Sequence, residues 1–276
     1  MDIKAFKMDG LGNDFVIIDR REEDVNLSKD QIIKIGDRNN VGFDQIIFIE
    51  KKINDVFPIK IFNPDGIEVG ACGNGSRCIA YLILKENNQR FIKLKAEKKI
   101  LEAEILNEKN VKINMGLPKF NEWYDIPLEN EKLNPKILEL DFLKKEFSKG
   151  FCVNVGNPHI IFFVEDCSKI NITNLGPKIE LHHYFPERVN VTFAQIIDNK
   201  NIKVNVWERG AGKTLACGTA ACATAFVAAQ TSKSENPVNI HFQKGHLKIE
   251  IQPNKSILMT GPVSEPQKIE VNLNED

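Results

Sequence analysis

The chain of 276 residues has little that would direct it to a membrane, to nucleic acid or to export. No apolar run approaches the roughly 18 residues needed to span a bilayer, and the first residues lack the apolar core of a secretory signal. The formal net charge is -1, with lysines and glutamates spread along the chain. Such a distribution offers no basic surface to a nucleic acid or an anionic membrane. These absences predict a cytoplasmic protein.

The spacing of the cysteines also argues against a disulfide framework and against zinc. Six cysteines are present, and no export signal accompanies them. Cys72 and Cys78 are six residues apart and Cys217 and Cys222 are five apart, so neither pair forms a C-x-x-C knuckle, and no histidine lies close by. No metal is therefore expected. The remaining two cysteines, at 152 and 167, stand among apolar residues and are expected to be buried, inert thiols.

Two short segments carry most of the information, ACGNG at 71–75 and ACGTA at 216–220. Each runs into an apolar stretch that predicts a helix, roughly at 75–85 and at 219–230. The two cysteines, Cys72 and Cys217, are 145 residues apart, about half the chain. One such segment is explained most simply as a helix start built from small residues that pack tightly. Two at matched positions favour a pair of thiols that face one substrate.

A cysteine at a helix start suits acid–base chemistry. A free thiol has a pKa of about 8.5, and the unpaired N–H groups and the dipole of a helix N-terminus favour the thiolate. The same N–H groups bind anions, and the glycine after each cysteine lets a carboxylate approach the backbone. A thiolate on one face of a carbon and a thiol on the other would invert that centre, as a racemase or epimerase does. No cofactor motif is visible, so none is expected.

Other pieces of the chain repeat at nearly the same offset. Gly12-Asn13 recurs as Gly156-Asn157, and Gly66 is matched by Gly210, both 144 residues later. Gln45 falls opposite Asn190 at an offset of 145. Together with Cys72 and Cys217, these matches make four agreements at an almost constant offset, which predict two copies of one fold.

The local patterns predict an α+β protein. Short β-branched runs bounded by turn residues indicate strands at 15–19, 45–49, 58–62, 109–114, 151–155, 159–164, 202–207 and 247–251. A further helix is expected at 27–38 with Ser28 as its N-cap. Each half is then a set of strands around one central helix. Pro118 and Gly261-Pro262 mark the boundaries, giving an N-terminal half of 1–117 to which 263–276 returns, and a C-terminal half of 118–262. The active site is expected in the cleft between the halves.

At this point the chain resembles the diaminopimelate epimerase family, almost from end to end. The resemblance is carried by short polar motifs in the family's order: GLGNDF at 10–15, DQ at 44–45, FNPDG at 62–66, ACGNG at 71–75, GNPH at 156–159, RVN at 188–190, WERGAG at 207–212 and ACGT at 216–219. It implies pyridoxal-independent interconversion of LL- and meso-diaminopimelate, in lysine and peptidoglycan precursor synthesis. It also implies two pseudo-symmetric halves, each a curled, mostly antiparallel sheet around a helix.

The resemblance assigns roles to individual residues. Cys72 and Cys217 would be the acid–base pair, with His159 and Glu208 beside the reaction. Glu208 would also bind substrate. The full set of substrate-binding residues is Asn13, Gln45, Asn63, Gly73, Asn74, Asn157, Asn190, Glu208, Arg209, Gly218 and Thr219. Such a set suits a substrate that is zwitterionic at both ends, since amides supply donors and acceptors and Arg209 can clamp a carboxylate. Taken one by one, these residues could equally be turn residues or a surface ion pair.

Departures and alternatives remain. Trp207 stands where the family often has tyrosine, Lys213 where an acid is common and Ala220 where glycine is usual. Family members are often dimers, which predicts a homodimer, although the tail lacks an aromatic residue that many members place there. The nearest alternative is a two-thiol racemase or epimerase for proline or hydroxyproline. An alternative of another class is a redox-sensing protein whose two thiols form a disulfide.

Overall fold

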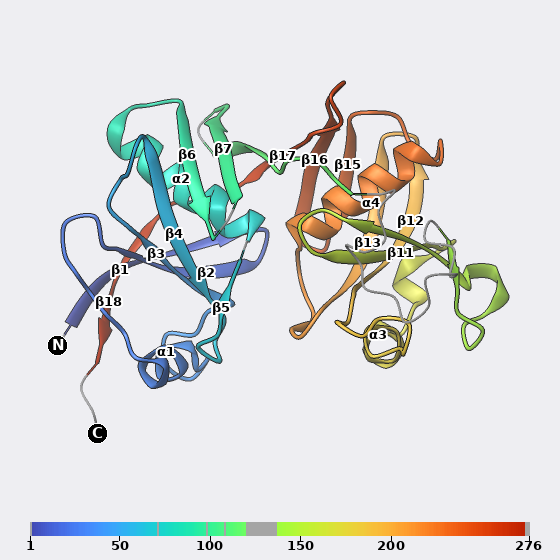
Figure 1. Ribbon diagram of the computed structural model, residues 1–276, viewed down its shortest axis with the longest axis horizontal. Coiled ribbons are helices and arrows are strands. Elements are labelled where there is room, and N and C mark those ends of the chain that lie inside the picture. The colour runs from blue at the N-terminus through green and yellow to red at the C-terminus, as the bar shows by residue number, and fades with distance from the viewer. Residues whose placement is uncertain (1, 71, 98, 108, 120–136, 274–276) are drawn as a thin grey trace. The chain divides into compact units, whose positions relative to one another are not determined.

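The computed structural model describes residues 2–70, 72–97, 99–107, 109–119 and 137–273. Ala71, the first residue of one cysteine segment, lies outside these ranges. The chain separates into two compact units, one of Met1–Asn114 with Thr260–Asp276 and one of Met115–Met259. Figure 1 shows the C-terminal strand β18 beside β1, in the unit that holds the N-terminus. No helix within the described ranges is long and apolar enough to cross a membrane.

The first unit is built on a mixed sheet. Its elements are β1 (Asp2–Gly10), β2 (Asn13–Asp19), α1 (Lys29–Gly36), β3 (Gln45–Ile49), β4 (Val56–Phe62), β5 (Glu68–Val69), α2 (Gly73–Asn87), β6 (Phe91–Ala96), β7 (Lys99–Ile105), β8 (Asn110–Asn114) and β18 (Gln267–Asn272). Antiparallel pairs join β18 to β1, β1 to β2, β3 to β4, β4 to β5, β6 to β7 and β7 to β8. The pairs β2–β3 and β4–β6 are parallel.

The second unit contains β9 (Leu138–Glu139), β10 (Lys149–Asn154), β11 (Pro158–Phe163), α3 (Ile172–Glu180), β12 (Asn190–Asp198), β13 (Asn201–Glu208), β14 (Gly212–Lys213), α4 (Gly218–Gln230), β15 (Val238–Phe242), β16 (Gly245–Ile251) and β17 (Ile257–Pro262), of which β17 continues into the first unit. Two 3-10 turns lie at Lys145–Phe147 and Cys167–Lys169. Antiparallel pairs join β9 to β10, β10 to β11, β12 to β13, β13 to β14 and β15 to β16. The pairs β11–β12 and β13–β15 are parallel.

The two units share one order of pairings. In each, a parallel pair spans the first helix and another parallel pair spans the second. The register agrees as well, because Ile46 lies opposite Phe62 and Val191 lies opposite Trp207, an offset of 145 on both strands. The Gly66–Gly210 match is wrong by one position. Gly66 donates its N–H to the carbonyl of Asn63, whereas Ala211, not Gly210, donates to the carbonyl of Glu208.

Each unit buries one helix on all its sides, as expected for a helix that is apolar all round. Every residue of α2 from Gly73 to Leu84 is buried, and α2 contacts β1, β2, β3, β6, β7 and β8. In α4 all residues except Thr219, Ala229 and Gln230 are buried. Both helices begin directly after their cysteines, at Gly73 and Gly218, slightly earlier than the sequence predicts. The α+β class and the two helices that follow the cysteines are therefore confirmed.

Every strand expected from a β-branched run is present, with small differences at its ends. The helix α3 was not expected, because its sequence ITNLGPKIE contains a glycine and an internal proline. Packing overrides this low propensity, since Ile172 and Ile179 are buried in the core of the second unit. The strands β6 (FIKLKA) and β7 (KILEAEI) were not predicted either, because lysines or glutamates interrupt their apolar residues and each holds few β-branched residues.

The helix α1 depends on its cap. Ser28 accepts the N–H of Gln31 at 3.2 Å and the side chain of Gln31 accepts the N–H of Ser28 at 2.8 Å, forming a capping box. We expect Ser28→Ala to lower the free energy of unfolding by about 1 kcal/mol in denaturant titrations. Ser28→Thr keeps the accepting oxygen and should lose only a few tenths of a kcal/mol. An equal loss in both variants would show that the cap oxygen contributes nothing.

Candidate active site

The first cysteine is the N-cap of α2. Cys72 has extended backbone angles (φ -144°, ψ 107°), and its sulfur accepts the N–H of Gly75 at 3.3 Å. A side chain at Gly75 would lie 2.5 Å from Cδ1 of Ile47 and 3.4 Å from the sulfur. Glycine lets the helix start approach β3 and the thiol without any shift of Ile47. Cys72 is half-buried.

Four side chains of the first unit form a directed relay of three hydrogen bonds. The guanidinium of Arg77 donates to Oδ1 of Asn74 at 2.9 Å, Nδ2 of Asn74 donates to Oδ1 of Asn13 at 3.3 Å, and Nδ2 of Asn13 donates to Asp44 at 2.7 Å. Arginine can only donate and a carboxylate can only accept. The two ends of the relay therefore fix which way both amides face. Asn13 and Asn74, both expected in the site, are brought together.

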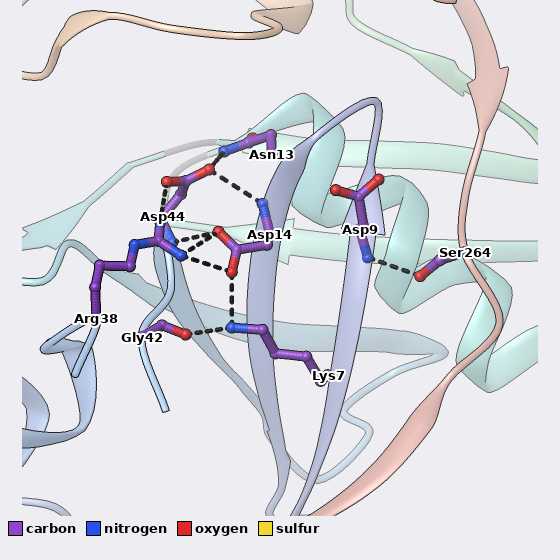
Figure 2. Close-up of polar contacts among 8 residues, drawn as sticks. All are labelled: Lys7, Asp9, Asn13, Asp14, Arg38, Gly42, Asp44 and Ser264. Carbon is purple, nitrogen blue, oxygen red and sulfur yellow. Dashed lines mark hydrogen bonds and ion pairs between the residues drawn. The ribbon is translucent and has the colours of Figure 1, made fainter. Parts of the chain in front are cut away.

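Figure 2 shows what holds the acidic end of this relay. Asp44 also accepts the N–H of Asp14 at 3.1 Å, and Arg38 donates to both carboxylates. Lys7 pairs with Asp14 at 2.7 Å and contacts the carbonyl of Gly42. Burial raises the pKa of Asp14, but its hydrogen bonds to Arg38 and Lys7 outweigh that and leave the pKa below its ordinary value. Two acids and two bases thus form one cluster beside Asn13.

The two other amides expected in the first unit also meet. Gln45 begins β3, and its Nε2 donates to Oδ1 of Asn63 at 3.1 Å, just after β4. Because β3 and β4 are antiparallel neighbours, the start of one lies at the end of the other. Residues 18 positions apart in the chain therefore share one edge of the sheet.

The second cysteine is the N-cap of α4. Cys217 has nearly the same backbone angles as Cys72 (φ -139°, ψ 115°), but only 4% of it is exposed. Its sulfur lies 3.4 Å from Oγ1 of Thr219. Burial and the negative charge of Glu208 raise the pKa of Cys217 well above its ordinary value, and the hydrogen bond to Thr219 opposes that only in part. The helix start does not by itself produce a thiolate here, because desolvation dominates.

His159 reaches this thiol through two other side chains. Its Nε2 is 2.9 Å from Oδ1 of Asn157, whose Nδ2 donates to Thr219 at 3.3 Å. His159 is completely buried, and burial together with the positive charge of Arg209 lowers its pKa to about 3. The imidazole is therefore neutral at physiological pH. The hydrogen-bond network assigns the ring proton to Nε2, which faces the side-chain oxygen Oδ1 of Asn157.

The last group is organised by Asn190. Its Nδ2 donates to the carbonyl of Pro158 at 2.7 Å, and its Oδ1 accepts the backbone N–H of Arg209 at 2.9 Å. The guanidinium of Arg209 also donates to the carbonyl of Glu187 at 3.1 Å. Asn190 thus joins the GNPH segment to the WERGAG segment, two motifs that are far apart in the sequence.

Sequence reasoning missed several residues that hold this site. Arg77 is completely buried, and its one signal was a basic residue inside an apolar helical run. Asp14 belongs to the GLGNDF motif and Asp44 to the DQ motif, but nothing in their spacing predicted that they cluster with Lys7 and Arg38. Among the described residues, no group of three or more histidines, cysteines, aspartates or glutamates is placed so that it could hold a metal ion.

Comparison with known proteins decides the family. The family model described as diaminopimelate epimerase matches residues 5–121 and 151–265. A diaminopimelate epimerase of Pelagibacter ubique is 50% identical over 276 residues, covering 99% of this chain and 100% of that protein. Another, from Nitrosospira multiformis, is 40% identical and covers 95% of each. The chain belongs to the diaminopimelate epimerase family. It is accordingly an epimerase, a kind of isomerase.

Solved structures show the same fold at much lower identity. A protein of Pseudomonas aeruginosa described as a predicted epimerase aligns over 99% of this chain and 100% of its own, with a TM-score of 0.71 and 14% identity. A hydroxyproline epimerase of Agrobacterium vitis aligns over 99% and 93%, with a TM-score of 0.69 and 10% identity. This chain thus shares its fold with these proteins although few of their residues are identical.

The buried histidine leads to a prediction about pH. Since the pKa of His159 falls from 6.5 to about 3 on folding, the unfolded chain binds an extra proton between these values. The contribution of the neutral His159 to the free energy of unfolding is fully present above pH 6.5 and is lost as the pH falls from 6.5 towards 3. Replacing the ring by an uncharged amide, His159→Gln, should reduce the slope of unfolding free energy against pH by up to about 1.4 kcal/mol per pH unit. Urea titrations between about pH 6.5 and 4.5 measure it, and an unchanged slope would contradict the assignment.

Proposed function

We propose that the protein interconverts LL- and meso-diaminopimelate without a cofactor, with Cys72 and Cys217 as the two acid–base groups. The observation that carries the proposal is the matched placement of the two cysteines, each the N-cap of a buried helix, in a member of the diaminopimelate epimerase family. Such a reaction belongs to lysine and peptidoglycan precursor synthesis.

In the proposed mechanism the thiolate of one cysteine removes the α-proton from one face of the carbon. The electron pair passes into the adjacent carboxylate, and the thiol of the other cysteine delivers its proton to the opposite face. The first sulfur ends as a thiol and the second as a thiolate, so the charges balance and the centre is inverted. The raised pKa of Cys217 favours its protonated form in the free protein, which suits the acid of the pair.

The charge that develops on the substrate carboxylate needs donors. In the proposal these are the backbone N–H groups of Gly73 and Asn74 at one helix start and of Gly218 and Thr219 at the other. The first N–H groups of a helix have no partner inside it and carry the positive end of its dipole. Backbone N–H groups aimed at the carboxylate would stabilise the growing negative charge.

The remaining residues would hold the two ends of diaminopimelate. Arg209 suits a carboxylate and Glu208 an ammonium, while the amides at 13, 45, 63, 157 and 190 supply oriented donors and acceptors. His159, neutral and buried, would act on Cys217 through Asn157 and Thr219 and not as a base.

The shared order of pairings supports a further part of the proposal. We take the N-terminal half (1–117 with 263–276) and the C-terminal half (118–262) to be pseudo-symmetric copies of one fold. The mechanism requires one sulfur from each to address opposite faces of the same carbon.

Six free cysteines, two of them proposed to be reactive, suit a reducing compartment, so the cytoplasm is proposed. A homodimer remains the expected assembly.

The test of this function is proton NMR of LL-diaminopimelate in deuterium oxide with reduced, metal-free protein. We expect the α-proton signal to disappear while the meso isomer appears, because a two-base reaction returns a proton from solvent. Folded protein with both thiols free that exchanges no α-proton would refute the proposal. Exchange with L-proline or hydroxyproline in place of diaminopimelate would favour the alternative substrate class.

The two-thiol mechanism makes a separate prediction. We expect Cys72→Ala and Cys217→Ala each to reduce kcat at least a thousandfold, since either change removes one of the two proton carriers. The matched control is Cys152→Ala, which removes a thiol buried in the hydrophobic core of the second unit. It should lower thermal stability but leave turnover per folded molecule unchanged. Substantial turnover in either of the first two variants would rule out the pair.

A further inference from the structure

One buried carboxylate contacts the chain on both sides of the Glu208–Arg209 pair. Glu180, the last residue of α3, is 5% exposed. Its Oε2 accepts the indole N–H of Trp207 at 2.7 Å, and its Oε1 accepts the backbone N–H of Gly210 at 2.9 Å. The two hydrogen bonds fix the residue before the pair and the residue after it.

The pair itself lies in a tight turn. Ala211 donates its N–H to the carbonyl of Glu208 at 3.1 Å, so Arg209 and Gly210 are the two central residues. Gly210 has a φ of +76°, in the left-handed region that the third residue of a type II turn requires. The N–H that Glu180 accepts belongs to the peptide between the two central residues. This hydrogen bond therefore fixes the plane of that peptide, and with it the direction in which Arg209 leaves the turn.

The indole is held against α3 as well as bonded to it. A side chain added at Gly176 would lie 2.5 Å from Cγ and Cδ2 of Trp207. Glycine at this position lets the ring lie directly on the helix, where its N–H reaches Glu180. The tryptophan that departs from the family pattern thus has a specific partner.

We propose that Glu180 is a positioning residue that holds Glu208 and Arg209 in place for substrate by accepting the N–H groups of Trp207 and Gly210. The proposal rests on the proposed function of Glu208 and Arg209 in binding diaminopimelate. Glu180 does not touch substrate itself; it acts through the turn. Asn190 holds the same turn through the N–H of Arg209.

The sharpest variant is Glu180→Gln, which keeps the size of the side chain and removes one acceptor. The two donors now face one oxygen and one NH2 group, so one of them meets another donor. A buried donor without an acceptor is costly, and the turn or the indole must shift. We expect kcat/KM for diaminopimelate to fall at least tenfold, with a rise in KM because Arg209 is displaced.

The second variant removes the conflict. Trp207→Phe deletes the indole N–H, so the glutamine oxygen can accept from Gly210 while its NH2 group faces the ring. We expect Glu180→Gln to cost at least tenfold in kcat/KM when Trp207 is present and less than threefold when it is combined with Trp207→Phe. A residue that only contributes stability would leave kcat/KM per folded molecule unchanged in both backgrounds.

The control is Glu165→Gln, the same substitution at an exposed position of the same unit, which should leave kcat/KM unchanged. All rates are measured well below the melting temperature of each variant and divided by the folded fraction. A second readout does not depend on activity: the 15N-indole resonance that Trp207→Phe removes should move upfield in Glu180→Gln, because its acceptor is weakened or lost.

The outcomes separate the two proposals. An inactive wild type would end the proposed function and leave the indole measurement to test the contact. Active enzyme in which Glu180→Gln keeps its kcat/KM, or loses it equally in both backgrounds, would overturn the positioning role. A loss that appears in KM and is recovered in the double variant would establish it.

Discussion

The unpaired amide groups at the start of a buried helix are the constraint on which each unit depends. A helix that is covered by strands on all sides cannot leave its first N–H groups to bulk water, so side chains, backbone or a ligand must accept them. Cys72 meets part of this need through its sulfur, which accepts the N–H of Gly75. In both segments the residue after the cysteine is glycine, so no side chain stands between the cysteine and the first turn. The structural requirement and the proposed chemistry therefore fall on the same few atoms.

Burial then decides the state of the ionisable groups. Cys217 and His159 are both driven towards their neutral forms, the thiol by burial and by Glu208, the imidazole by burial and by Arg209. The charged side chains of the first unit behave differently, because they are clustered with opposite charges at the edge of the sheet. Around Cys217, burial and the nearby charge of Glu208 thus act in the same direction and favour the protonated thiol.

Much of the fold could be predicted from local patterns. The strand at 45–49 has the expected bounds, and Ser28 is the expected cap of its helix. The helix α3 could not be predicted, because a glycine and a proline lower its propensity while buried isoleucines stabilise it. Glu180 ends that helix, so its role was hidden for the same reason. Propensity is a local property, and packing against a distant segment overrides it.

The sequence by itself determined the two cysteine–glycine helix starts, the offset of 145 between them and the family, because each of these is written in residues that are neighbours in the chain. Only the tertiary structure decided which side chains meet. The relay from Arg77 to Asp44, the link from His159 to Cys217 and the two hydrogen bonds of Glu180 all join residues from separate elements. Their partners are set by strand register and helix packing. Those depend on the burial of the whole core and not on any local run of residues.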